Sequence, residues 1–186
     1  MMSEDGGLWV FGYGSLMWRP GFAFEEMQPA LVRGYHRSLC IFSHVHRGSP
    51  ETPGLVLGLD RAGACRGVAF RVAPSERETT IAYLREREQV TSVYKEVHLR
   101  TRLKDERIVT SVAYVVDPGH PQYAGRLHRA DVLRFVSQGH GISGANRDYV
   151  RATHDHLAAA GIEDTCLAWI VANLPDPGVK RSGFSE

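Results

Sequence analysis

The sequence predicts an α+β fold: a mostly antiparallel β-sheet, able to curl into a barrel, with one inserted helix and flanking C-terminal helices. Segments rich in β-branched and aromatic residues, bounded by Gly, Pro and Asp clusters, fill most of the chain before residue 117. A single segment with helical periodicity interrupts them, and three more follow. A run of strands followed by a run of helices is typical of α+β architectures.

Six strands are expected, each apolar or alternating and each ended by a turn signal. They cover residues 9–11, 31–43, 55–59, 65–72, 94–103 and 108–116. A hairpin turn is expected at 60–64, between the third and fourth strands. Residues 22–27 predict a short helix or an irregular excursion.

Four helices are expected, one between the fourth and fifth strands and three after the last strand. They cover residues 74–89, 129–138, 146–160 and 163–173. Ser75 and Glu78 fit a capping box at the start of the first helix. Gly161 is expected to cap the end of the third helix, and residues 175–186 are expected to form a polar tail.

Length and composition predict one domain over residues 1–186, with its core at about 8–174. The chain is 43% hydrophobic and 23% charged, which is ordinary for a soluble globular protein. A net charge of +1 without a basic run argues against nucleic acid or a membrane surface as a partner. Nothing marks a large exposed interface, so no dedicated protein partner is expected.

The three cysteines lie far apart and form no C-x-x-C pair, which fits a reducing, cytoplasmic compartment. The polar and acidic first residues lack the regions of a signal peptide. No stretch of about 18 apolar residues is present, so no membrane span is expected.

The turn after the first strand is the strongest candidate for a binding site. Two glycines allow positive φ and let another group approach the backbone. Successive N–H groups in such a turn can point into one concavity, which suits a carboxylate or an oxyanion. The plain alternative is a structural turn with its tyrosine in the core. The candidate residues are Val10, Phe11, Gly12, Tyr13, Gly14, Ser15 and Leu16.

The second candidate is Glu88, in the last turn of the inserted helix. At 100° per residue, it falls on the same helix face as Ile81 and Leu84. Desolvation and the helix dipole both disfavour the charged carboxylate there, so its pKa should be raised, as suits a general base near neutral pH. The alternative is a carboxylate at a fraying helix end, in water or paired with Arg85 or Lys95.

Other side chains carry weaker signals. The nine histidines show no H-E-x-x-H or Cys/His quartet, so no metal site is expected. Residues 139–146 can present N–H groups to an anion, or connect two helices with Ser143 or Asn146 as a helix cap. Tyr123 can aim its phenol at a site or simply pack. Glu86 and Arg87 lie off the apolar helix face.

Several short motifs follow one another along the chain, each occurring once. They are VFGYGSLMW at 10–18, HRG at 46–48 with PGL at 53–55, GVAFR at 67–71, YL, RE, VT and Tyr94 within 83–94, and Gly141, Ser143-Gly144, Asn146 and Tyr149-Val150. By order and spacing they resemble the ChaC family of γ-glutamylcyclotransferases in its bacterial form. The resemblance covers about residues 8–174.

The resemblance implies a γ-glutamylcyclotransferase-like barrel with flanking helices and no metal or organic cofactor. It implies cleavage of γ-glutamyl peptides, glutathione above all, into 5-oxoproline and the remaining amine, which is Cys-Gly for glutathione. Two alternatives stay open: other γ-glutamyl amino acids or γ-glutamylamines as substrates, and a non-enzymatic binding or regulatory role.

The residue roles that go with this activity are expectations as well. Glu88 is expected to act as general base and then acid while the substrate's α-amine attacks its own γ-carbonyl. Residues 10–16 and Tyr123 are expected to bind the substrate. Arg47, with His46, is expected to meet the glycine carboxylate of glutathione.

Overall fold

A closed five-stranded barrel forms the centre of the computed structural model, which describes residues 7–88 and 92–175. Neighbouring strands are antiparallel except for the parallel β1–β5 pair that closes the barrel. The predicted α+β class and the mostly antiparallel barrel are confirmed. The strand order is β1 (Leu8–Gly12), β3 (Gly54–Val72), β2 (Glu26–Ser43), β4 (Tyr94–Leu103) and β5 (Ile108–Val116).

β1 is the shortest barrel strand, and all five of its residues are buried. Its sequence, Leu-Trp-Val-Phe-Gly, carries no charge, so burial of both faces costs no ion desolvation. β3 flanks it on one side and β5 on the other, with Gly12 opposite Val68. Because β1 is held on both edges, the turn that follows Gly12 leaves the barrel at a fixed place.

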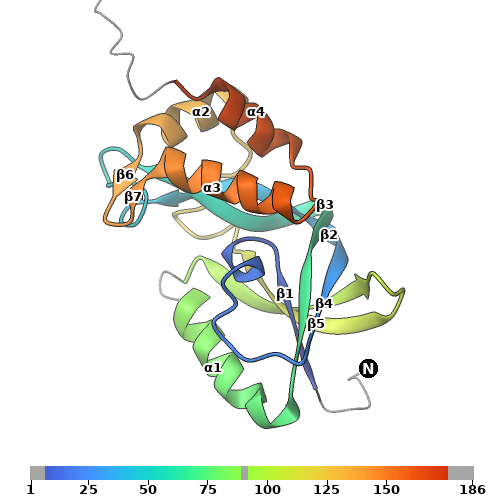
Figure 1. Ribbon diagram of the computed structural model, residues 1–186. Coiled ribbons are helices and arrows are strands. Elements are labelled where there is room, and N and C mark those ends of the chain that lie inside the picture. The colour runs from blue at the N-terminus through green and yellow to red at the C-terminus, as the bar shows by residue number, and fades with distance from the viewer. Residues whose placement is uncertain (1–6, 89–91, 176–186) are drawn as a thin grey trace, which may run out of the picture.

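The prediction of a hairpin turn at 60–64 is wrong, because β3 is a single strand that pairs antiparallel with β2 along nearly its whole length. The register between the two strands shifts around Gly34. Gly34, Ala62 and Gly63 have positive φ there. Turn-forming torsions therefore make a bulge that bends both strands instead of ending them. Beyond the bend, β2 and β3 continue beneath the C-terminal helices (Figure 1).

The start of β2 also differs from the expected strand. Glu26 and Met27 already pair with Arg71 and Phe70 of β3. Residues 22–27 therefore contain no helix, and the chain is irregular only up to residue 25. The long run of pairing partners on β3 extends β2 past the point where its own pattern becomes apolar.

The helices lie in two places. Figure 1 shows α1 at one end of the molecule and the three C-terminal helices grouped at the other. No helix in the described ranges is both long and apolar enough to cross a membrane. The helices are α1 (Arg77–Glu88), α2 (Arg129–Gln138), α3 (Asn146–Ala159) and α4 (Thr165–Asn173), with short 3-10 turns η1 (Ser15–Met17) and η2 (Pro74–Glu76) and a small hairpin of β6 (His140–Gly141) and β7 (Gly144–Ala145).

Two predicted helix ends have different outcomes. The capping box of Ser75 and Glu78 is wrong: Ala73 takes the N-cap position of η2 without a side-chain hydrogen bond, and a proline follows with its φ already fixed for a helix. At the end of α3, Ala160 takes the C-cap position, and the predicted cap residue Gly161 follows it with φ of 70° and its N–H on the Ala158 carbonyl at 2.9 Å. Gln89, the predicted last residue of α1, lies outside the described residues.

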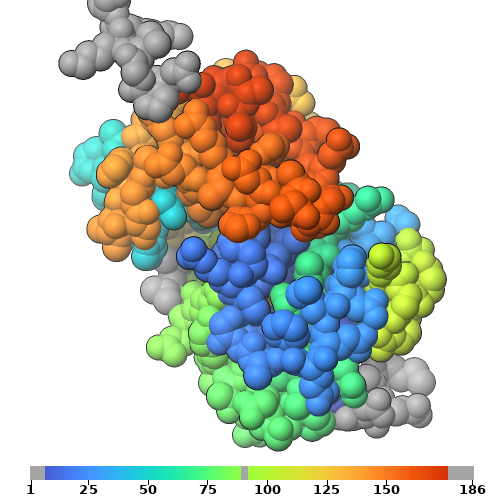
Figure 2. Space-filling model, viewed as in Figure 1, coloured from blue at the N-terminus to red at the C-terminus, as the bar shows by residue number. Residues whose placement is uncertain are grey.

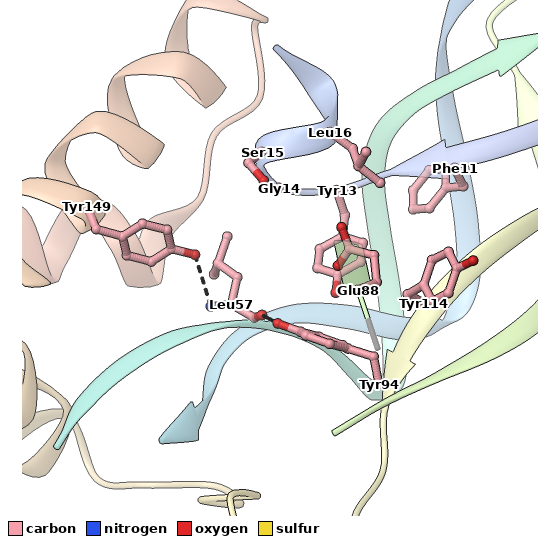
Figure 3. A pocket seen from close by; sticks show the side chains of 10 residues that line it. All are labelled: Phe11, Tyr13, Gly14, Ser15, Leu16, Leu57, Glu88, Tyr94, Tyr114 and Tyr149. Atoms are coloured by element: carbon pink, nitrogen blue, oxygen red, sulfur yellow. Dashed lines mark hydrogen bonds between the residues drawn. The ribbon is translucent and has the colours of Figure 1, made fainter. Parts of the chain in front are cut away.

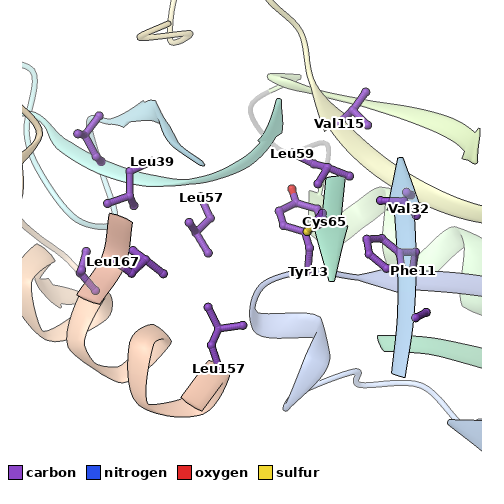
Figure 4. Close-up of a cluster of buried hydrophobic side chains, with 14 of the residues drawn as sticks. Phe11, Tyr13, Val32, Leu39, Leu57, Leu59, Cys65, Val115, Leu157 and Leu167 are labelled. Carbon is purple, nitrogen blue, oxygen red and sulfur yellow. The ribbon is translucent and has the colours of Figure 1, made fainter. Parts of the chain in front are cut away.

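The largest hydrophobic cluster runs from the barrel interior into the space beneath the C-terminal helices (Figure 4). Phe11 and Val32 fill the barrel end, while Leu157 of α3 and Leu167 of α4 come from the helical side. Leu57 of β3 lies between them (Figure 4). Burial of each such side chain contributes about 1.5–3 kcal/mol. This shared core holds α3 against the barrel end from which β1 emerges.

Candidate active site

The turn after β1 presents three backbone N–H groups, those of Gly14, Ser15 and Leu16, that find no acceptor within the described chain. Gly14 is the N-cap of η1, and Ser15 and Leu16 are its first two residues, so no earlier helical carbonyl is available to these N–H groups. Neither glycine of the turn adopts the positive φ that glycine allows. Glycine serves a steric purpose instead, because a Cβ on Gly12 would lie 3.1 Å from the Cβ of Leu16.

A cavity of about 70 Å³ lies against this turn. Figure 3 shows the Glu88 carboxyl at its centre, with Gly14 and Ser15 on one side and Tyr94 on the other. Leu57 of β3 and Tyr149 of α3 complete the wall nearest the helices. The full lining is Phe11, Tyr13, Gly14, Ser15, Leu16, Leu57, Glu88, Tyr94, Tyr114 and Tyr149.

Glu88 is the single carboxylate that lines the cavity. Its side chain is 18% exposed, and burial raises its pKa while the neighbouring Arg87 guanidinium, with Nε 3.3 Å from Oε1, lowers it. The predicted direction of the shift is confirmed. The two alternative ion pairs do not form, because Arg85 pairs with Glu96 and Lys95 with Asp117.

Three tyrosines surround this carboxylate, of which Tyr13 is buried and Tyr94 and Tyr149 are partly buried. The hydroxyl of Tyr94 donates to the Leu57 carbonyl at 2.7 Å, and that of Tyr149 accepts from the Leu57 N–H at 3.1 Å. The Tyr13 hydroxyl makes no hydrogen bond to any described residue. Burial raises the pKa of all three phenols, so they stay protonated at neutral pH. Tyr13 therefore offers the cavity a free O–H donor.

An outer cleft of about 650 Å³ opens from the inner cavity and shares Ser15, Glu88, Tyr94 and Tyr149 with it. Figure 2 shows the blue segment that follows β1 directly against the orange surface of α3. Where these segments meet, the Trp18 and His156 rings stack with centroids 4.3 Å apart. The inner cavity and the outer cleft are therefore adjacent and share part of their walls.

Arg47, the predicted carboxylate contact, lines the outer cleft together with His46. Its Nη1 donates to the Ser143 carbonyl at 2.5 Å, and its guanidinium lies 5.3 Å from the centre of the Tyr149 ring. The His46 ring is 2.9 Å from the Ser143 hydroxyl. These contacts hold Arg47 and His46 in the wall of the outer cleft.

Three other predicted residues lie away from the cavity. Val10 is fully buried in a hydrophobic cluster beside Leu84. The Tyr123 hydroxyl donates to Asp60 at 2.9 Å, and Tyr123 lines neither the inner cavity nor the outer cleft. Asn146 is not a helix cap, since Ala145 takes the N-cap position of α3 without a side-chain hydrogen bond.

Two arginines beside the cavity were not predicted as site residues. Arg87 contacts both Ser15 and Glu88. Arg37 is almost fully buried, and its Nε donates to the Tyr13 carbonyl at 2.6 Å while Nη1 lies 3.6 Å from Asp164. The sequence signal for Arg87 is its place beside Glu88 in the RE motif of the family resemblance, and Arg37 has no such signal.

No three His, Cys, Asp or Glu side chains in residues 7–88 and 92–175 gather closely enough to hold a metal ion. Cys40 and Cys65 are buried free thiols, and Cys166 is an exposed one. Neither buried thiol lines the inner cavity. The chemistry that the cavity itself offers is therefore one buried carboxylate, unpaired N–H donors, a serine hydroxyl and tyrosine hydroxyls.

Comparison with known families decides where this chain belongs. A family model described as "ChaC-like protein" matches residues 8–175. The chain belongs to the ChaC-like family. The match takes in both walls of the cavity, from the turn after β1 to the whole of α3.

Relatives within and near this family carry related names. A protein of Escherichia coli (strain K12) named "Glutathione-specific gamma-glutamylcyclotransferase" is 31% identical over 98% of this chain and 82% of its own length. A human protein, "Glutathione-specific gamma-glutamylcyclotransferase 1", is 35% identical over 88% of this chain and 77% of its own length. A crystal structure of a yeast γ-glutamylcyclotransferase specific to glutathione superposes with a TM-score of 0.78 at 21% identity, over 89% of this chain and 94% of that one. This likeness supports the fold.

Proposed function

We propose that this protein is a γ-glutamylcyclotransferase that cleaves glutathione into 5-oxoproline and Cys-Gly. One observation carries the proposal: the single carboxylate that lines the inner cavity, the largely buried Glu88 with its raised pKa, faces a turn whose N–H groups have no acceptor in the described chain. The names of the E. coli and human relatives support glutathione as the substrate.

The reaction is an intramolecular aminolysis, and Glu88 serves it twice. The carboxylate takes a proton from the substrate's α-ammonium, and the freed nitrogen attacks the γ-carbonyl carbon to close a five-membered ring. The carbonyl electron pair moves onto oxygen. When the carbonyl reforms, the bond to the cysteine nitrogen breaks and protonated Glu88 gives that nitrogen its proton, while the ring nitrogen loses its second proton to solvent. General acid–base help of this kind is worth about 10²–10⁴-fold in rate.

A raised pKa suits both halves of this role. Burial disfavours the Glu88 carboxylate, which makes it a stronger base than an exposed glutamate. The same burial makes the protonated form long-lived enough to act as the acid in the second step. A carboxylate with an ordinary pKa would hold the proton too weakly to return it to the leaving nitrogen.

The turn after β1 binds the charges of the substrate in this proposal. The N–H groups of Gly14, Ser15 and Leu16, with the hydroxyls of Ser15 and Tyr13, receive the α-carboxylate or the oxyanion formed at the γ-carbon. Loss of one preorganised oxyanion donor typically costs about 10²–10³-fold in kcat. The cavity wall also folds the extended γ-glutamyl chain so that its nitrogen meets its own γ-carbon, which is a proximity effect.

The outer cleft receives the Cys-Gly half of glutathione. Its lining includes Arg47 and His46, which suit the glycine carboxylate. Tyr123 is left without a direct contact to substrate, because its hydroxyl already donates to Asp60.

We also propose that residues 1–186 form one domain. The protein works in a reducing, cytoplasmic compartment in this proposal, in keeping with its three free cysteines.

The test is release of 5-oxoproline from glutathione by the purified protein. Glu88→Gln is expected to abolish release without loss of folding, whereas Glu86→Gln, which changes an exposed carboxylate on the same helix, is expected to keep it. Each assay is repeated with a chelator, and unchanged rates are expected. Release that survives Glu88→Gln would show that the base is another group. No release from glutathione but release from γ-glutamyl-alanine would move the substrate to other γ-glutamyl compounds.

A further inference from the structure

The guanidinium of Arg87 connects the two walls of the inner cavity. Nη2 donates to the Ser15 hydroxyl oxygen at 2.9 Å, and Nε lies 3.3 Å from Glu88 Oε1. Ser15 comes from the turn after β1 and Glu88 from the end of α1, 73 positions along the chain. One rigid, planar group therefore touches both the substrate-binding turn and the carboxylate.

The third guanidinium nitrogen, Nη1, anchors the Arg87 side chain itself. Nη1 donates to the Arg19 carbonyl at 2.7 Å, to the Pro20 carbonyl at 3.3 Å and to the Tyr83 hydroxyl at 2.9 Å. The Arg87 side chain is 23% exposed, so these bonds form largely out of bulk water. Tyr83 lies one helical turn before Arg87, so the anchor ties the end of α1 to the loop that follows η1.

The contact to Ser15 also decides what its hydroxyl can do. An arginine N–H can only donate, so Ser15 Oγ accepts and one of its lone pairs is occupied. The Ser15 proton is then free to point into the cavity as a donor. A donor suits the anionic oxygens of the substrate, whereas a serine whose oxygen is held by a cation is poorly suited to act as a nucleophile.

We propose that Arg87 is a positioning residue: it fixes the distance between the Ser15 hydroxyl and the Glu88 carboxylate, and it keeps the Ser15 proton directed at the substrate. The inference rests on the proposed cyclotransferase activity, for which it names a residue that acts through two others. A lysine cannot replace it, because a single ammonium does not reproduce the planar fork that reaches Ser15, Glu88 and the loop carbonyls together.

The positive charge of Arg87 has a separate effect on Glu88. The charged and titratable groups that face the carboxylate are Arg87 on α1, Tyr13 on the turn, Tyr94 on β4, Tyr114 on β5 and Tyr149 on α3. The phenols have raised pKa values and stay neutral near pH 7. Within the described residues, Arg87 is thus the one cation that pairs with Glu88, and it offsets part of the increase in the Glu88 pKa caused by burial.

The experiment compares Arg87→Gln, Arg87→Lys and the matched control Arg85→Gln. The control removes a positive charge from the same helix, but from an exposed arginine that pairs with Glu96. Arg87→Gln is expected to lower kcat/KM by about 10²-fold, the typical cost of misplacing a reacting group by about 1 Å. It is also expected to move the acid limb of the pH profile of kcat/KM to higher pH. Arg87→Lys should leave the limb near its wild-type position yet fail to restore the rate.

A double-mutant cycle tests the route through Ser15. If Arg87 acts by holding the Ser15 hydroxyl, Ser15→Ala and Arg87→Gln together lose less than the product of their separate fold-losses. Losses that multiply would overturn the positioning role. So would an Arg87→Gln variant no slower than Arg85→Gln, or full rescue by lysine.

A readout independent of turnover separates this proposal from the proposed function. The Glu88 carboxyl is titrated by NMR in glutamate-labelled protein, with Glu88→Gln used to assign its signal. Its pKa is expected to rise in Arg87→Gln and to stay unchanged in Arg85→Gln, and equal pKa values in all three proteins would overturn the proposed contact. A wild-type protein that releases no 5-oxoproline would refute the cyclotransferase activity, while the titration would still test Arg87.

Discussion

Asn146 joins the start of α3 to the start of β3, and its replacement by alanine is expected to destabilise the protein strongly. The side chain is fully buried. Its Oδ1 accepts from the Leu55 N–H and its Nδ2 donates to the Leu55 carbonyl, both at 2.7 Å. Leu55 is fully buried as well. Asn146→Ala leaves one buried N–H and one buried C=O without partners.

The expected loss follows from these two groups. A buried polar group left without a hydrogen bond costs about 1–3 kcal/mol, so the pair costs about 2–6 kcal/mol. In a chain of this length each kcal/mol lowers Tm by about 2–4 °C, which gives a fall of about 4–24 °C. The loss also loosens α3, which carries Tyr149 in the cavity wall, so 5-oxoproline release is expected to fall at temperatures well below the new Tm.

The measurement is denaturant and thermal unfolding of the wild type, Asn146→Ala and a matched control. Asn173→Ala is that control, because Asn173 is exposed and makes a single hydrogen bond, to the Trp169 carbonyl at 2.8 Å. It is expected to change stability by less than about 0.5 kcal/mol. A loss below about 1 kcal/mol in Asn146→Ala would refute the reasoning, since it would mean that Leu55 finds other partners at no cost.

Two further predictions concern the charged side chains of the site. Arg47→Ala is expected to raise KM for glutathione more than it lowers kcat, because Arg47 lines the outer cleft but not the inner cavity that holds the Glu88 carboxyl; an unchanged KM with unchanged Tm would remove it from the substrate site. Glu88→Gln is expected to raise Tm near pH 7, because burial raises the Glu88 pKa. The stability that Glu88 contributes is complete below its unfolded-state pKa and is lost as pH rises through its folded-state pKa, so near pH 7 the ionised carboxylate destabilises the fold. The Tm difference should therefore shrink to nothing below about pH 4, and a difference independent of pH would contradict the buried-carboxylate account.

The parts of the site that the sequence predicted are those set by local pattern. The segment before Gly12 is uncharged and rich in aromatic and β-branched residues, which favours a buried strand. The Gly-rich turn follows where that strand ends. Helical periodicity alone placed Glu88 on the same face as Leu84, which is fully buried. Both features depend on residues within a few positions of each other, so no knowledge of the rest of the fold was needed.

The hairpin predicted at 60–64 shows where local pattern stops being sufficient. Positive φ at Ala62 and Gly63 is compatible with a tight turn and equally with a bulge. The pairing partner decides between them, and here β2 continues past the bulge as a partner for β3 on both sides. The turn signal was correctly located, but its structural outcome depends on a strand about 28 residues earlier in the chain.

The two arginines of the site show a different limit. Periodicity put Arg87 off the apolar face of α1, and that is where it lies, but the polar face of this helix meets the loop after η1 and not bulk solvent. Besides its ion pair with Asp164, Arg37 donates to the backbone carbonyls of Tyr13 and Arg66, which any residue type supplies. Because a carbonyl leaves no mark in the sequence, a charged side chain that positions a loop through backbone contacts looks the same as one on the surface. Only the fold, which brings Tyr13 beside residue 37 of β2, tells them apart.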